Sequence, residues 1–216
     1  MKNFLKRISI FLSSIAITCV IIEVMLRQIP NDYKLKSDFL RTNSDDVEVL
    51  VLGGSHSLFG INPVYMGMKG FNSSNPSQSL DYDLAILKKY RSNWSSLKFV
   101  VIPLSYSSLF EDLNGITESW RIKNYIIYYR IRDIKHPKYH AEIFNGPLLT
   151  QFYRLYNYYY KKVDYVQCTE FGWNASYSSV SQQNLIKSGI EASKRHTVRD
   201  KRKFNKMSEN LVSIVS

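Results

Sequence analysis

The stretch Val47-Glu48-Val49-Leu50-Val51-Leu52-Gly53-Gly54-Ser55-His56-Ser57 decides how this chain folds. The apolar residues between Val47 and Leu52 form the pattern of a short buried strand. Two glycines follow, and glycine permits a sharp turn without a clash at Cβ. Ser55 comes directly after them. The stretch therefore predicts a strand, a tight turn and a helix that begins at Ser55.

Ser55 has two interpretations at such a junction. Its hydroxyl is expected at the carboxyl edge of a sheet, where α/β folds bind their ligands. Backbone N–H groups at the turn can stabilise a developing oxyanion there, so Ser55 is a candidate nucleophile. Serine is also a common N-cap of a helix. The local pattern leaves both interpretations open.

The residues after this stretch predict a parallel α/β arrangement. Gly70–Asn72 is expected to form a short second strand, and the Ser-, Asn- and Pro-rich segment 72–79 a loop. Ser79–Arg91 has the apolar spacing of a helix, with acidic residues in its first turn and basic residues in its last. Leu97–Leu104 is predicted to be the next strand. A strand, a helix and a strand of these lengths form a βαβ unit.

The second half of the chain is rich in tyrosine, of which the whole protein has 16. Tyr125–Ile131 fits a helix or a strand. Pro147–Tyr160 predicts a helix with an apolar stripe, made of Leu148, Phe152, Leu155 and Tyr159. Two further helices are expected near Ser181–Lys194 and Lys201–Val215. Tyrosines in such segments indicate half-buried packing more often than a surface for stacking sugars.

The N-terminus has the features of a membrane anchor. An apolar run from Ile8 to Met25 is about as long as a bilayer-spanning helix requires. Lys2, Lys6 and Arg7 precede it, which predicts a cytoplasmic N-terminus and an extracytoplasmic remainder. Glu23 is the one charge in the run and lies near its far end. A cleaved signal peptide is the alternative.

These features divide the chain into residues 1–28 as anchor, 29–46 as a polar stalk and 47–216 as a partial α/β domain. The net charge of +11 suits an anionic polymer or membrane surface. Without an RNA-binding signature or a basic helix, nucleic acid is not expected as a partner. Cys19 and Cys168 form no disulfide framework. The sequence predicts neither a metal site nor a cofactor.

Two blocks of sequence carry a resemblance to a known superfamily. Val49–Pro63 resembles the first block of SGNH/GDSL-type esterases and acyltransferases, and Gly70–Leu80, followed by the strand Phe99–Leu104, resembles their next part. The likeness is greatest to the membrane-anchored bacterial branch near the alginate O-acetyltransferases and the D-alanyl transfer protein of teichoic acid synthesis. One departure is Gly54, which stands where the usual Gly-Asp-Ser has aspartate.

The resemblance implies a three-layer α/β/α parallel sheet, SGNH- or flavodoxin-like and incomplete, after one transmembrane helix. It implies an esterase or O-acyltransferase acting on a cell-surface polysaccharide, with Ser55 as catalytic nucleophile. Gly54, His56, Asn75 and Ser105 are the candidates for the oxyanion hole and the lining of the site.

The catalytic base is the missing part. The family takes it from a late Asp-x-x-His block, and only Asp133 and His136 have that spacing, in the middle of the chain. The sequence therefore predicts a truncated chain or a natural pseudoenzyme that is inert or nearly so. A non-catalytic glycan-binding or polysaccharide-assembly protein is the alternative function.

Overall fold

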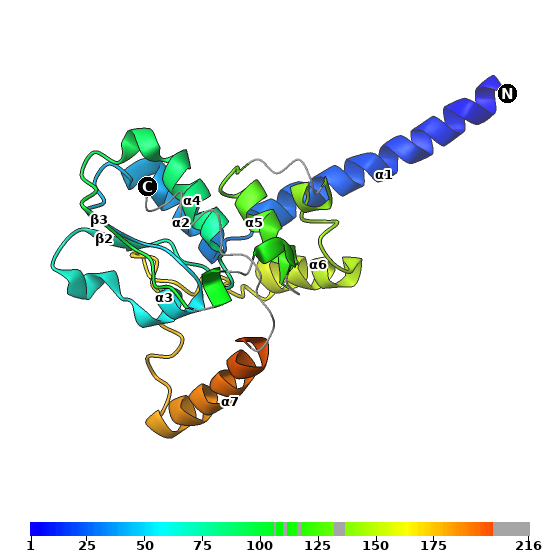
Figure 1. Cartoon of the computed structure of the whole chain (residues 1–216). Coiled ribbons are helices and arrows are strands. Elements are labelled where there is room, and N and C mark those ends of the chain that lie inside the picture. Colours follow the sequence, from blue (N-terminus) through cyan, green and yellow to red (C-terminus); the bar gives the residue numbers. More distant parts are fainter. Residues whose placement is uncertain (106, 110–111, 116–117, 132–136, 201–216) are drawn as a thin grey trace.

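The computed structural model describes residues 1–105, 107–109, 112–115, 118–131 and 137–200 of the chain (Figure 1). A long N-terminal helix projects from an α/β body (Figure 1). The α-helices and strands are α1 Lys2–Gln28, α2 Asp32–Asn43, β1 Val49–Val51, α3 Ser55–Gly60, β2 Gly70–Asn72, α4 Leu80–Lys89, β3 Phe99–Val101, α5 Ile122–Ile127, α6 Leu148–Leu155 and α7 Gln182–Asp200. Short 3-10 turns connect several of these, and η7 (Tyr156–Tyr160) extends α6 as a π-helix.

The described strands form a small parallel sheet in the order β2-β1-β3. Leu50 in β1 lies between Phe71 of β2 and Val100 of β3. Every residue of β1 is buried, as expected for a central strand with side chains covered on both faces. The strands, their parallel direction and helix α4 between β2 and β3 confirm the α/β prediction for residues 47–104.

A helix in the segment predicted to be a polar stalk completes the core around the sheet. Residues 32–43 form α2, which is capped by the Asn31 side chain accepting from the Lys34 N–H. Tyr33 and Leu40 of this helix are buried in the same cluster as the sheet residues. Phe39 stacks on Phe71 of β2 at 3.9 Å between ring centroids. Segment 29–46 is therefore part of the folded body.

The two outer strands differ in how they are covered. The backbone N–H of Asn72 in β2 donates to the carbonyl of Phe171, so a late segment of the chain lies along that edge. Gly172 makes this possible, because a Cβ there would lie 2.0 Å from the Asn72 carbonyl oxygen. On β3, by contrast, Phe99 is 58% and Val100 39% exposed. Among the described strands, β3 is thus an open edge with apolar side chains.

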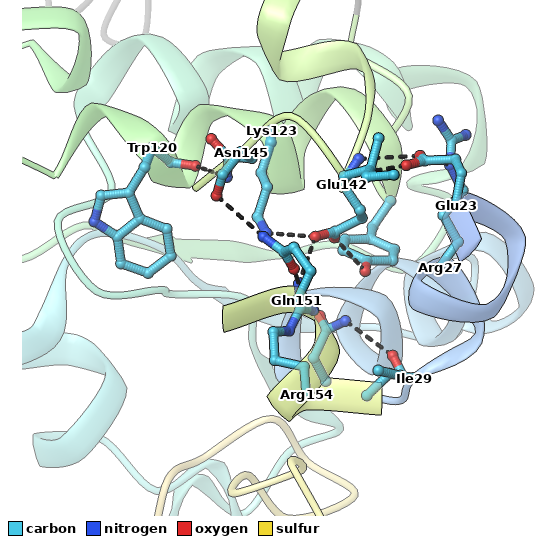
Figure 2. A network of polar contacts seen from close by, with 12 residues as sticks. Glu23, Arg27, Ile29, Trp120, Lys123, Glu142, Asn145, Gln151 and Arg154 are labelled. Carbon is cyan, nitrogen blue, oxygen red and sulfur yellow. Dashed lines mark hydrogen bonds and ion pairs between the residues drawn. The ribbon is translucent and has the colours of Figure 1, made fainter. Parts of the chain in front are cut away.

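Helix α1 is long and apolar enough to cross a membrane, and none of its most apolar stretch is buried in the protein. Its last turns are different, because Leu26 and the following Ile29 are buried against Ile143. The Glu23 carboxylate accepts hydrogen bonds from the backbone N–H groups of Glu142 and Ile143 at 3.0 and 2.9 Å. Figure 2 shows this junction between α1 and the body.

The tyrosine-rich half is helical but packs differently from the prediction. Pro147–Tyr160 does form a helical segment, α6 followed by η7. Of the predicted apolar stripe, Leu155 and Tyr159 pack against the end of α1, whereas Leu148 and Phe152 are exposed. Tyr125–Ile131 begins within α5, and α7 covers the predicted helix 181–194. The helix expected at 201–215 lies outside the described residues.

Candidate functional site

The segments that follow the three strands meet at one edge of the sheet, because parallel strands place their carboxyl ends together. The Asn75 N–H, after β2, donates to the Gly53 carbonyl after β1 at 3.2 Å. Pro103, after β3, lies 3.8 Å from the point where a Cβ of Gly53 would be. The turn that precedes Ser55 is therefore flanked by residues that follow the other two strands.

The turn that presents Ser55 depends on Gly53. Its φ of +105° belongs to a region that other residues rarely adopt, and a Cβ there would lie 2.8 Å from Ser57 Oγ. Gly54 is the N-cap of α3, and Ser55 is the first residue inside the helix. The Ser55 hydroxyl therefore does not cap the helix. The side chain is half-buried and its hydroxyl forms no hydrogen bond within the described part of the chain.

The other candidate site residues differ in burial and in their hydrogen bonds. His56 is exposed, next to Ser55 on the outer side of α3. Asn75 is fully buried, and its amide nitrogen donates to the Ser73 carbonyl and to Gln78 Oε1. Ser105 is at the correct edge but bonds to Ser108 through its backbone N–H at 3.0 Å. Asn75 and Ser105 thus shape loops at the site, and their donors are engaged there.

A buried carboxyl group beneath the turn was not among the sequence candidates. Asp83 Oδ1 accepts the Gly53 N–H at 2.9 Å and the Gln78 Nε2 at 2.6 Å. Burial raises the pKa of Asp83 from 3.8 to about 7, although both hydrogen bonds favour the ionised form. The spacing in the sequence could have indicated this burial. Asp83 lies three residues after Leu80 and three before Ile86, which places it on the buried face of α4.

A second buried ionisable group supports the loop after β2. Lys36 of α2 is fully buried and donates through Nζ to the Ser74 carbonyl. Burial lowers the pKa of Lys36 to about 8. The neighbouring Ser73 hydroxyl pairs with the Tyr129 hydroxyl at 3.2 Å. The loop 73–75 is therefore held by Lys36 of α2 and by Tyr129, the second residue after α5.

The predicted base is not located by the structure. Asp133 and His136 lie outside the described residues. The His140 carbonyl accepts from Arg27 Nη2 at 2.7 Å, which places this residue at the end of α1 rather than beside the β1 turn. The described residues therefore include the candidate nucleophile Ser55 and the glycine turn before it. Among these residues, none is assigned as the base that would take the Ser55 proton.

Two cavities lie away from the serine. One of about 660 Å³ is at the opposite, amino edge of β1 and β2, between Phe39, Glu48, Pro63 and Lys69. The other, of about 570 Å³, extends from Pro76 of the site loop to the polar side of α6, and Trp120 and Arg121 form part of its wall. Ser55 lines neither of these two cavities.

Comparison with known proteins gives no match to a protein-family model, a curated protein or a solved structure.

Proposed function

We propose that the chain is a membrane-anchored SGNH-like esterase or O-acyltransferase that acts on a cell-surface polysaccharide. In this proposal the described parallel sheet belongs to a three-layer α/β/α domain, α1 spans the cytoplasmic membrane with its N-terminus inside, and the body lies outside. Ser55 is the nucleophile.

The observation that carries the proposal is the placement of Ser55. It follows a buried central strand and a glycine at φ +105°, and it begins α3 at the edge where ligands bind in parallel sheets. Its half-buried hydroxyl has no partner among the described residues, and the N-cap position belongs to Gly54.

The chemistry would proceed by transfer of an acyl group through the serine. Ser55 Oγ attacks the carbonyl carbon of an ester and gives up its proton to a base, and the departing alcohol takes a proton in turn. Water or a sugar hydroxyl then attacks the acyl-serine, which releases Ser55. Without an aligned base the first step is slow, although binding and the oxyanion hole can leave a residual enhancement of roughly 10³–10⁴-fold.

The test compares two neighbouring serines in the full-length chain in detergent. Ser57 is a matched control because it lies in the same helix, is fully buried and has a hydroxyl without a partner among the described residues. With a generic acetyl ester, we expect slow turnover that Ser55→Ala abolishes and Ser57→Ala retains. Equal turnover by the wild type and Ser55→Ala would overturn the proposal.

The alternative, a glycan-binding or assembly protein, is favoured by the cavity beside α6. Trp120 is 45% exposed at its wall, and the Arg121 guanidinium carbon lies 4.4 Å from the Trp120 ring centroid. An exposed aromatic ring beside a cation is suited to an anionic sugar. If the chain binds anionic polysaccharide with an affinity that falls in Trp120→Ala but not in Ser55→Ala, while no turnover is detected, the binding function is the better account.

A further inference from the structure

Helix α6 and its extension η7 are oriented in an unusual way for a surface helix. Their outward side chains are large, apolar or aromatic, and about half or more of each is exposed: Leu148, Leu149, Phe152, Tyr153, Tyr156 and Tyr160. We call this set the outer face of α6–η7. An ordinary surface helix of a soluble domain turns its apolar side inward.

The polar residues of α6 are turned toward the body instead. Gln151 is buried, and Arg154 Nη1 donates to Glu142 at 2.8 Å (Figure 2). Glu142 is fully buried and also accepts from Lys123 and from the Tyr128 hydroxyl. Burial alone opposes ionisation, but the two cations lower the pKa of Glu142, so the carboxylate and its partners hold the polar side of α6 inward.

The outer face exposes six large apolar or aromatic side chains. Contiguous exposed apolar patches mark contacts with a protein or a membrane. The surroundings of the outer face in the structure favour a membrane.

The outer face lies next to the candidate membrane span. At one border of this face, Leu155 and Tyr159 of the same helical segment pack at the end of α1, and the Tyr159 hydroxyl donates to the Met25 carbonyl at 3.1 Å. Figure 1 shows α6 beside this end of α1. Just before that point, Ile21 and Val24 of α1 are about half exposed. An apolar surface on α1 thus borders an apolar surface on α6–η7.

The composition of the outer face also fits a bilayer surface. Tyrosine is enriched where membrane meets water, because its ring is apolar and its hydroxyl is polar. The exposed Lys161 and Lys162 follow directly, and Lys161 Nζ lies 5.4 Å from the Tyr156 ring centroid. Lysines at the edge of an apolar face can reach anionic headgroups.

We propose that the outer face of α6–η7 lies in the interfacial layer of the membrane that α1 spans. The body is then held against the bilayer at two places, by a spanning helix and by a helix lying on the surface. This inference rests on α1 as a membrane span and is independent of catalysis by Ser55.

The test measures the depth of single positions in the full-length chain. A polarity-sensitive fluorophore is attached to one cysteine introduced by Phe152→Cys, in a background without Cys19 and Cys168. The protein is reconstituted at low density in vesicles of phosphatidylcholine and phosphatidylglycerol. Two control sites are Thr150→Cys, exposed about 200° around α6 from residue 152, and Tyr65→Cys, 86% exposed on the body. Near-ultraviolet circular dichroism verifies the fold of each protein.

We expect blue-shifted emission at position 152, strong quenching by nitroxide-bearing lipids and weak quenching by iodide. Positions 150 and 65 should show the reverse. Strong iodide quenching at position 152 would overturn the proposal, since the face would meet water. Protection at 152 from both quenchers would also overturn it, because the face would then be covered by protein, such as a second copy of the chain.

Discussion

Gly53 and Gly54 are adjacent residues with different reasons for being glycine. Gly53 needs its positive φ and the space beside Ser57, whereas Gly54 has an ordinary φ of −85° and its Cβ would meet nothing closer than 3.8 Å. We expect Gly53→Ala to lower the free energy of unfolding by about 1–3 kcal/mol. Gly54→Ala should change it by less than about 0.5 kcal/mol, because a less flexible unfolded chain offsets a poorer N-cap.

Thermal unfolding of the two variants in detergent measures this difference. Equal melting temperatures for Gly53→Ala and Gly54→Ala would contradict the described turn.

Asp83 gives the protein a pH dependence of predictable sign. Its pKa is about 7 in the folded chain against an ordinary 3.8, so between these values the unfolded chain releases a proton that the folded chain keeps. The stabilising effect of the neutral carboxyl is complete below about pH 4 and is lost as the pH rises through 7. One such group contributes a slope of up to about 1.4 kcal/mol per pH unit.

Asp83→Asn should remove this slope and keep the fold, because the amide oxygen can still accept from Gly53 and Gln78. Melting temperatures of both proteins from pH 4 to 8 provide the measurement. Parallel curves for the wild type and the variant would show that Asp83 does not titrate in this range.

At the scale of elements, the parts of the fold that follow from local pattern were predictable. β1, β2, β3 and α4 combine apolar runs, glycines and charges that all favour one structure. Helix α2 was missed because its polar composition suggested a stalk. Its Lys36 is buried only because a carbonyl from the loop after β2 receives the ammonium group, and no local pattern reveals a partner 38 residues away.

The same limit explains the rest of the site and of α6. The position of Ser55 at the start of α3 was predictable from the glycines, but Asp83 was interpreted only as a charge matching the helix dipole. The direction in which α6 faces depends on the buried Glu142, whose partners come from distant segments. The spacing of residues within α6 predicts an apolar stripe. It does not predict whether that stripe or the polar side of the helix packs against the body.

At the scale of the whole molecule, Glu23 joins helix α1 to the body. Its carboxylate accepts two backbone N–H groups, at residues 142 and 143, and pairs with Arg27. Hydrogen bonds to charged groups contribute about 1.5–3 kcal/mol. Glu23→Ala should therefore speed amide hydrogen exchange across 141–145, while the loop 73–75 keeps its protection.

Glu23→Gln is the matched control, since the amide oxygen can retain one of the two bonds and should give an intermediate rate. Unchanged exchange at 141–145 in Glu23→Ala would show that the junction is held by apolar packing alone.

The burial of Ile29 directly after α1 has a consequence for where this protein can work. Because α2 starts three residues later, no flexible linker separates α1 from the body. Under the proposed function, with α1 in the membrane, this short junction would hold Ser55 at a fixed height above the lipid. Polysaccharide still attached to the bilayer would then lie within reach of Ser55, and polymer farther out in the envelope would not.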